Sequence, residues 1–252
     1  EQIEDEIALA LQIIDHVYKV FGFEYDIELS TRPDDYMGEL ALWDKAEQAL
    51  ENVLKRLGFP YKINEGDGAF YGPKIDIHIK DAIRRSHQCA TVQLDFQLPE
   101  KFDLTYINED NEKLRPVVIH RAVFGSIDRF LGILIEHFGG AFPLWLAPKQ
   151  VQLIGVSTVH KEYVDLVAGA LRKEGIRVAV DQRNEKLGRK IRDAGMQKVP
   201  YILVLGDEEQ QTETVSVRAY KQEGLFKMSI AAFIQQVKEE IEQKKLPIIM
   251  NL

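Results

Sequence analysis

The stretch PVVIHRAVFGSIDRFLGILIEHF, residues 116–138, decides the fold of the chain around it. It begins with an apolar run typical of a strand, passes a glycine and a serine, and continues with the apolar spacing of a helix. Unpaired N–H groups at such a helix start form an anion site. Arg129 follows one turn later, and its planar, always-charged guanidinium suits phosphate oxygens. The stretch therefore predicts an anion site, for which a nucleotide is a candidate.

The composition is that of a folded protein. The 252 residues are 45% hydrophobic, enough for one large domain or two smaller ones and too much for a disordered chain. No run of about 18 apolar residues occurs, so we expect no membrane span. The single cysteine, Cys89, excludes an internal disulfide framework and fits a reducing, cytoplasmic location. The acidic N-terminus has no basic signal segment and no methionine, so we expect an internal piece of a longer protein.

Charge is unevenly distributed along the chain. The net charge is −8, yet residues 147–252 hold 17 Lys and Arg against 14 Asp and Glu, whereas residues 1–146 hold 15 against 26. This asymmetry suggests that only the second half binds a polyanion, although ordinary variation in surface charge explains it equally well.

The first 146 residues read as helices and strands of an α+β domain. Helices are expected over residues 2–20 and 43–57, each closed by a glycine. The expected strands span residues 25–29, 61–63, 74–82, 86–96, 104–107 and 117–119. Because few helices separate these strands, they predict an antiparallel sheet.

The order of expected helices and strands changes at FPLWLAP, residues 142–148. We interpret this segment as the boundary between domains 1–146 and 147–252. Strands then alternate with helices of about 10 to 15 residues, as in a small α/β domain with a mixed sheet. The expected strands span residues 151–156, 177–180, 201–205 and 214–218, and the expected helices span residues 161–173, 187–196 and 229–242.

Several ordered motifs resemble one enzyme family. HRAVFGSIDRFLG (residues 120–132) looks like the third signature motif of class II aminoacyl-tRNA synthetases, in the form found in threonyl-tRNA synthetases. Similar further segments are GAFYGPKIDI (68–77), QCATVQLDF (88–96), PLWLAPKQV (143–151), DQRNEKLGRKIRDA (181–194) and VPYILVLGDEE (199–209). The resemblance covers the whole chain. It implies a partial class II catalytic core with an antiparallel sheet, followed by an α/β anticodon-binding domain with a mixed sheet.

The resemblance also implies a threonine–tRNA ligase. ATP, with Mg²⁺, would activate threonine to threonyl-adenylate, and the threonyl group would pass to the 3′ end of tRNA(Thr). Arg129 would hold the triphosphate and stabilise charge as pyrophosphate leaves, and Lys74 would be the second catalytic residue. Gln88 and Thr91 would bind the adenylate, and Tyr71, Gln93 and Ala122 would bind threonine. Taken alone, Arg129 could form a helix-surface salt bridge, Tyr71 could be core packing and Lys74 could be solvated.

His120 has the sharpest implied role. Taken alone, a histidine after an apolar strand is usually a hydrogen-bonded core residue. In the resembled family, the matching histidine is one of three protein ligands of a catalytic-site Zn²⁺. The open position of that zinc takes the amino and hydroxyl groups of threonine, which rejects the nearly isosteric valine.

The chain departs from a complete enzyme of this family. The other two zinc ligands, a cysteine and a histidine, would lie upstream of Glu1. So would motif 1, which forms the homodimer, and motif 2, which carries an ATP-binding arginine. Cys89, His78 and His87 do not match ligand positions, and Cys89 is expected to be a small core residue. We therefore expect the isolated chain neither to bind zinc tightly nor to catalyse.

The second domain would bind tRNA. RNEKLGRKIR (residues 183–192) carries five cations and one acid, which predicts phosphate contacts or, more simply, a solvated helix face. By resemblance, Asn184, Lys198, Glu209 and Arg218 would contact anticodon bases. Lys198 stands where many relatives have arginine, which puts a bidentate contact in doubt.

Two alternatives remain open. The chain could be a non-catalytic, synthetase-like RNA-binding protein, although a pure scaffold need not keep Arg129, Gln88, Tyr71 and His120. A class II synthetase for proline or histidine is less favoured. Those families do not place a zinc-ligand histidine directly before Arg-Ala in the third motif.

Overall fold

The computed structural model describes residues 2–246. Contacts divide the chain into two compact units, Glu1–Leu134 and Ile135–Leu252. The domain boundary expected after residue 146 lies further along the chain than this division and stays a prediction. No helix in the described part of the chain is long and apolar enough to cross a membrane.

The first unit is built on a five-stranded sheet with the order β2-β1-β3-β4-β7. Its strands are β1 (Tyr25–Ser30), β2 (Lys62–Asn64), β3 (Lys74–Lys80), β4 (Ser86–Asp95) and β7 (Val118–Ala122). All neighbours pair antiparallel except β1 and β2. That pair is parallel because the chain crosses over between the two strands through a helix. The expected antiparallel sheet is therefore present, with one parallel pair at its edge.

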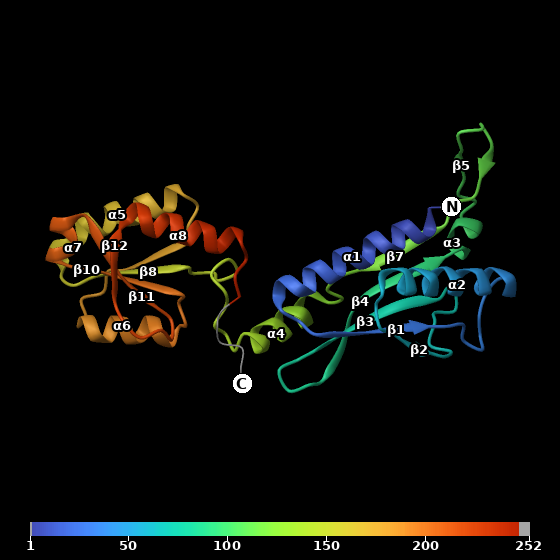
Figure 1. Ribbon diagram of the computed structural model, residues 1–252, viewed down its shortest axis with the longest axis horizontal. Coiled ribbons are helices and arrows are strands. Elements are labelled where there is room, and N and C mark those ends of the chain that lie inside the picture. Colours follow the sequence, from blue (N-terminus) through green and yellow to red (C-terminus); the bar gives the residue numbers. More distant parts are fainter. Residues whose placement is uncertain (1, 247–252) are drawn as a thin grey trace. The chain divides into compact units, whose positions relative to one another are not determined.

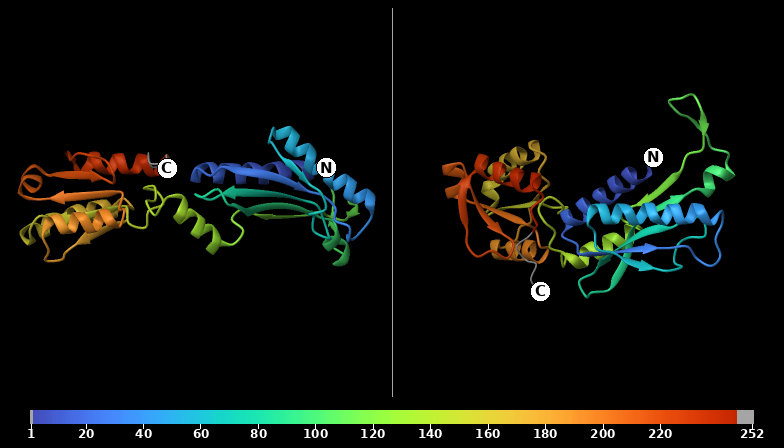
Figure 2. Two further views of the ribbon diagram at one scale, coloured as in Figure 1. Left: turned by 90° about the horizontal axis from the view of Figure 1, so that it is seen from below. Right: turned by 45° about the vertical axis from the view of Figure 1, so that its right-hand side comes forward.

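Two amphipathic helices lie on one side of this sheet (Figures 1 and 2). They are α1 (Ile3–Phe21) and α2 (Leu40–Leu57), and each ends at a glycine in the left-handed conformation. Alternate residues of the strands supply the apolar layer beneath them. The buried side chains of this unit include Ile7, Leu11, Ile14, Leu50, Leu54, Ile75, Ile77, Ile79, Val92 and Leu94.

Three short elements lie between β4 and β7, and only the first strand among them was expected. They are α3 (Gln97–Lys101) and the hairpin of β5 (Tyr106–Ile107) and β6 (Lys113–Leu114), which projects from the unit in Figure 1. The strand expected over residues 104–107 is only two residues long, because its partner is equally short. The side chain of Asn108 accepts hydrogen bonds from two backbone N–H groups of the hairpin turn. After β7 the chain enters α4 (Ile127–His137), the helix of the opening motif.

The second unit has a five-stranded mixed sheet with the order β12-β11-β10-β8-β9, as expected. The strands are β8 (Val151–Gly155), β9 (Val178–Asp181), β10 (Tyr201–Leu205), β11 (Thr214–Ala219) and β12 (Phe226–Ser229). The first three are mutually parallel, and β11 and β12 run antiparallel to their neighbours. The sequence patterns did not predict β12, the 3-10 turn η1 (Thr158–His160) or α7 (Asp207–Thr212).

Helices cover both faces of this second sheet. In Figure 1, α5 (Lys161–Lys173) and α8 (Ile230–Glu242) lie on one side and α6 (Leu187–Met196) on the other. The larger core is shared by α5, α8 and the strands and includes Leu153, Val167, Leu203 and Phe233. The smaller core, beneath α6, contains Ile154, Ala194 and Ile202.

Glu209 fixes the turn between β10 and α7 from inside the second unit. Its Oε2 accepts a hydrogen bond from the Gly206 backbone N–H (2.9 Å), and its Oε1 accepts one from the Ser216 hydroxyl (2.7 Å). Burial raises the pKa of this carboxyl, but the hydrogen bonds outweigh burial and hold the pKa below its usual value. The carboxylate therefore stabilises the fold above the usual pKa, and this contribution is lost as the pH falls through the folded-state pKa.

Gly72 lies against the backbone of β4. Its replacement therefore tests whether the fold requires this close backbone contact. A methyl group on its Cα would lie 1.8 Å from the carbonyl oxygen of Leu94. We expect Gly72→Ala to lower the free energy of unfolding by about 1–3 kcal/mol, because backbone must shift. Gly132→Ala in α4 is the control, since its methyl group would meet no atom within 4 Å outside the helix backbone. Urea denaturation measures both, and equal effects would contradict the steric argument.

The carboxylate of Glu209 gives a pH-dependent prediction. We expect Glu209→Gln to lower the free energy of unfolding at pH 7 by about 1–3 kcal/mol. The difference from the unchanged protein should shrink as the pH falls below the usual carboxyl pKa of 4.5. Chemical denaturation between pH 7 and pH 3 measures it, with Glu208→Gln as the exposed control on the same helix. A deficit that is independent of pH would show that the charge of Glu209 contributes nothing.

Candidate functional site

The face of the first sheet opposite α1 and α2 gathers most of the predicted site residues. Directly paired residues in an antiparallel sheet point to the same face. The pairs on this face are Lys74 with Gln93, Asp76 with Thr91, Gln93 with His120, and Thr91 with Ala122. Strand pairing therefore brings together side chains that lie far apart in the sequence.

The carboxylate of Asp76 lies at the centre of this polar face and is 2% exposed. It accepts hydrogen bonds from the Thr91 hydroxyl (2.7 Å) and from the Gln88 side-chain amide (2.5 Å), and it pairs with Lys74 Nζ at 2.7 Å. The Ser30 hydroxyl lies 3.4 Å away. Sequence reasoning missed Asp76, although its place between Ile75 and Ile77 put it on the polar side of the strand.

Lys74 is held as a cation by two carboxylates. Its Nζ lies 2.7 Å from Asp76 and 3.1 Å from Asp67. Burial opposes the charge, but the hydrogen bonds and charges of Asp76 and Asp67 outweigh it and raise the pKa of Lys74 above its usual value. At neutral pH the side chain is therefore an ammonium group with a fixed position.

Tyr71 and Gln93 form the next part of the face. The Tyr71 hydroxyl donates to Gln93 Oε1 (3.0 Å), and Gln93 Nε2 donates to the Gly72 carbonyl (3.2 Å). The Tyr71 ring also meets the His120 imidazole edge-on, with 6.0 Å between ring centroids. Two of the three predicted threonine-contacting residues, Tyr71 and Gln93, are thus joined to each other and placed beside His120.

His120 is oriented by a buried carboxylate that sequence reasoning did not single out. Its Nε2 lies 2.9 Å from Asp95 Oδ2, and the side chain of Asp95 is fully buried. Asp95 Oδ1 in turn accepts hydrogen bonds from the backbone N–H groups of Gln97 and Leu98. Tyr71, Asp95 and His120 line a cavity of about 450 Å³, together with Met37, Phe70, Gln97, Leu98 and Lys101.

The fit of His120 to a zinc site is partial. Its Nε2 faces Asp95, and a carboxylate behind the imidazole is the usual partner of a metal-ligating histidine. A catalytic zinc site needs about three protein ligands. Residues 2–246 contain no group of three His, Cys, Asp or Glu side chains that could hold a metal. His120 therefore fits one ligand of such a site.

Arg129 joins α4 to the edge of this face. Its Nη2 donates to the backbone carbonyl of Gln88 at 2.5 Å, and the side chain of Gln88 reaches Asp76. The tight turn before α4 favours Gly125, because its φ of +62° lies in the left-handed region and an added Cβ would lie 3.0 Å from the backbone carbonyl oxygen of Cys89. Cys89 is buried, as expected, and burial raises the pKa of its thiol.

In the second unit, three predicted anticodon contacts surround α6. Asn184 precedes the helix and Lys198 follows it. Arg218 pairs with Ile202 across β10 and β11, so its side chain lies on the face that α6 covers. Asn184 and Arg218 are exposed. Glu209 differs, since both of its carboxylate oxygens are engaged by Gly206 and Ser216.

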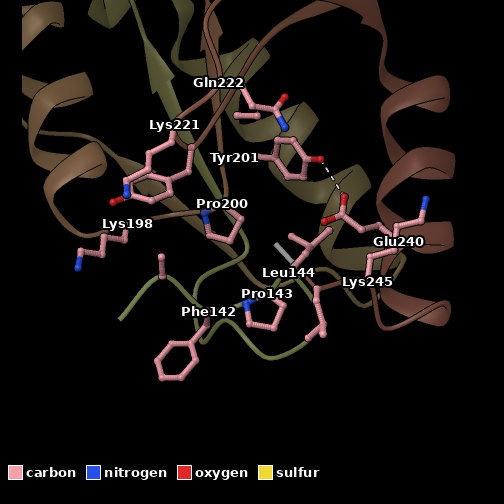
Figure 3. A pocket seen from close by; sticks show the side chains of 14 residues that line it. Phe142, Pro143, Leu144, Lys198, Pro200, Tyr201, Lys221, Gln222, Glu240 and Lys245 are labelled. Carbon is pink, nitrogen blue, oxygen red and sulfur yellow. Dashed lines mark hydrogen bonds between the residues drawn. The ribbon is translucent and has the colours of Figure 1, made fainter. Parts of the chain in front are cut away.

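Lys198 makes a contact that the sequence did not indicate. Its ammonium group donates to the carbonyl of Gly139, and its side chain lines a cavity of about 310 Å³ (Figure 3). On the other side of this cavity the Tyr201 hydroxyl donates to Glu240 Oε2 (2.8 Å). Burial, helped by Glu240, raises the pKa of Tyr201 to about 12. Lys198 is therefore held against the segment that leads into β8.

Comparisons with known proteins agree with this arrangement. Residues 1–138 match the family model of the tRNA synthetase class II core domain (G, H, P, S and T), and residues 150–240 match that of the anticodon binding domain. The chain is 61% identical over 244 residues to threonine–tRNA ligase 2 of Bacillus subtilis. It is 57% identical over 244 residues to threonine–tRNA ligase of Clostridium kluyveri. Each alignment covers 97% of this chain and 38% of the relative.

A solved structure also resembles this chain. The RNA binding domain of threonyl-tRNA synthetase from Cryptosporidium parvum aligns with a TM-score of 0.89 and 38% identity, over 95% of this chain and 60% of that chain. The core-domain model matches more than half of the chain, and the motif resemblance agrees with it. The chain therefore belongs to the class II aminoacyl-tRNA synthetases, within the threonyl-tRNA synthetase family, as a core domain followed by an anticodon-binding domain.

Proposed function

We propose that the chain is the part of a threonine–tRNA ligase that carries motif 3 and the anticodon-binding domain. The full enzyme would be a cytoplasmic homodimer that uses ATP with Mg²⁺, threonine and tRNA(Thr). The observation that carries this proposal is the polar face of the first sheet. On it, Lys74, Gln88 and Thr91 converge on the buried Asp76, and Arg129 is tied to the same strand.

In the first step, a carboxylate oxygen of threonine attacks the α-phosphorus of ATP, and the bond to the β-phosphate breaks. Negative charge then grows on the departing pyrophosphate. Arg129 would stabilise that charge, and Lys74, held as an ammonium group by Asp76 and Asp67, would hold the reacting carboxylate. Gln88 and Thr91 would hold the adenylate. Because Asp76 fixes their side chains in advance, little reorganisation is needed when the substrate binds.

Threonine would lie beside Tyr71, Gln93 and Ala122. His120 would supply one ligand of a Zn²⁺ in the full enzyme, which would coordinate the amino and hydroxyl groups of threonine. Asp95 would keep the imidazole in the orientation that ligation requires. A substrate without the hydroxyl would leave that coordination position unfilled, so valine would be rejected.

Recognition of tRNA would take place around α6. The exposed Asn184 and Arg218 would donate hydrogen bonds to the edges of unstacked anticodon bases. Lys198 would reach a base after releasing the carbonyl of Gly139. Glu209 would approach the anticodon only if its carboxylate exchanged an internal hydrogen bond for one to a base.

The role of Arg129 predicts a loss of adenylate formation. In the full-length enzyme, Arg129→Ala should reduce threonine-dependent ATP–pyrophosphate exchange by about 100-fold or more, because charge on the leaving group is no longer stabilised. Arg129→Lys should recover only part of the rate, since the planar fork is lost. Arg84→Ala, which removes an exposed arginine of the β3–β4 turn, is the control. Exchange that survives Arg129→Ala would refute the nucleotide role.

The role of Arg218 predicts a separation of the two steps. Arg218→Ala should lower kcat/KM for aminoacylation of tRNA by about 10- to 100-fold, which corresponds to the loss of one good arginine–base contact. ATP–pyrophosphate exchange should be unchanged, because the first unit is intact. Lys221→Ala, at the β11–β12 turn, is the control. A parallel loss of both activities would instead indicate a folding defect.

A further inference from the structure

The last turn of α4 is closed by a pair of glycines. The Gly139 N–H donates to the Glu136 carbonyl (3.0 Å), and the Gly140 N–H donates to the Ile135 carbonyl (2.9 Å). Both glycines have positive φ, +54° and +73°. This pair of hydrogen bonds is the common way to end a helix with a left-handed residue. The Gly139 carbonyl takes no part in it and accepts a hydrogen bond from the ammonium group of Lys198.

Lys198 closes a second helix with its backbone. Its N–H donates to the Gly195 carbonyl (3.0 Å), and the Val199 N–H donates to the Ala194 carbonyl (3.3 Å). With a φ of +54°, Lys198 is the left-handed residue just past α6, a position at which glycine is usual. A lysine there bears a backbone cost but keeps a long cationic side chain. One residue thus ends α6 with its backbone and contacts the end of α4 with its side chain.

The ammonium group of Lys198 acts as a cap on α4. A helix C-terminus carries a partial negative charge, which a cation at its last carbonyls stabilises. Within residues 2–246 no carboxylate forms an ion pair with Lys198. Glu240, the acid that lines the same cavity, lies on its other side and accepts from Tyr201 (Figure 3). The contact with Gly139 lies within the second unit, because the division of the chain falls inside α4.

Other contacts fix the next segment, residues 144–147, without Lys198. The Arg177 guanidinium and the Gln150 side-chain amide donate to three backbone carbonyls of this segment at 2.8 to 3.0 Å. Loss of the Lys198 cap would therefore loosen the end of α4 and residues 139–142, and it would leave residues 144–147 in place.

We propose that Lys198 is a switch residue whose ammonium group caps α4 in the RNA-free protein and is transferred to an unstacked RNA base when the anticodon binds. The negative potential of RNA favours transfer of the cation from a neutral carbonyl to an acceptor edge of a base. The last turn of α4, the helix that carries Arg129, loosens as the cap is lost. The base contact rests on the proposed function, whereas the cap does not.

Hydrogen exchange followed by mass spectrometry on the full-length protein tests the switch. A saturating anticodon stem-loop RNA should speed exchange of the amides of residues 135–141 about two- to fivefold, the effect of one cation at a helix C-terminus. Lys198→Met keeps a long side chain and removes its charge. This variant should show the faster exchange without RNA and no further change with it. Residues 144–147 should exchange equally in all samples, which shows that the fold is intact.

Three further variants separate a switch from a simple RNA contact. Lys198→Arg keeps the charge and should keep both the cap and the response to RNA. Arg218→Ala should weaken binding of the stem-loop, yet at saturating RNA the response of residues 135–141 should remain. Lys149→Met removes a nearby lysine that donates to Gln197 Oε1 instead (2.7 Å), and it should change nothing at α4.

The outcomes distinguish the switch from the proposed function. Unchanged exchange of residues 135–141 at saturating RNA, or a response that persists in Lys198→Met, would overturn the switch and leave tRNA binding intact. A stem-loop that does not bind would refute both the tRNA contact and the switch. Faster exchange in Lys198→Met would in that case establish the cap alone.

Discussion

The arrangement of the first unit depends on one buried carboxylate, that of Asp76. A carboxylate removed from water must be paired and hydrogen-bonded, or the fold loses several kcal/mol by order of magnitude. Lys74 supplies the charge from the same strand, and Thr91 and Gln88 supply donors from the neighbouring strand. A slip of one residue between β3 and β4 would turn those donors to the apolar face. The contacts that hold the register therefore also assemble the candidate site.

The longer elements could be predicted because each carries its own pattern. Apolar spacing marks α1, α2, α5, α6 and α8, and strict alternation marks β3. The missed elements are held by contacts that no local pattern records. The six residues of α7 depend on Glu209, whose partner Ser216 lies in the following strand. A strand was expected over residues 61–63, but its parallel pairing with β1 follows from the crossover through α2 and could not be read from the strand itself.

The candidate site likewise has a part that could be predicted from the sequence and a part that could not. Alternation alone puts Lys74 and Asp76 on one face, and the resemblance supplied roles for eight residues of the first unit. The supporting acids were missed, because an acid between apolar strand residues is usually solvated. Asp76 and Asp95 are buried only because residues of other strands and of α3 satisfy them. Burial of a charge is a tertiary property, so the motif shows the residues proposed to touch substrate and hides those that hold them in place.

The basic segment of the second unit shows why a count of charges is a poor measure of RNA binding. In the sequence its five cations look alike. In the structure, Arg183 is neutralised by two aspartates and Arg189 by Glu185, so each must exchange an internal partner for a phosphate and gains little. Exposed cations attract a polyanion at long range, but they are solvated and mobile. Lys190 is mostly buried and interacts electrostatically with Asp181, so its charge is also partly offset inside the fold. The number of cations in the segment therefore overstates the positive charge that is free to meet an RNA backbone.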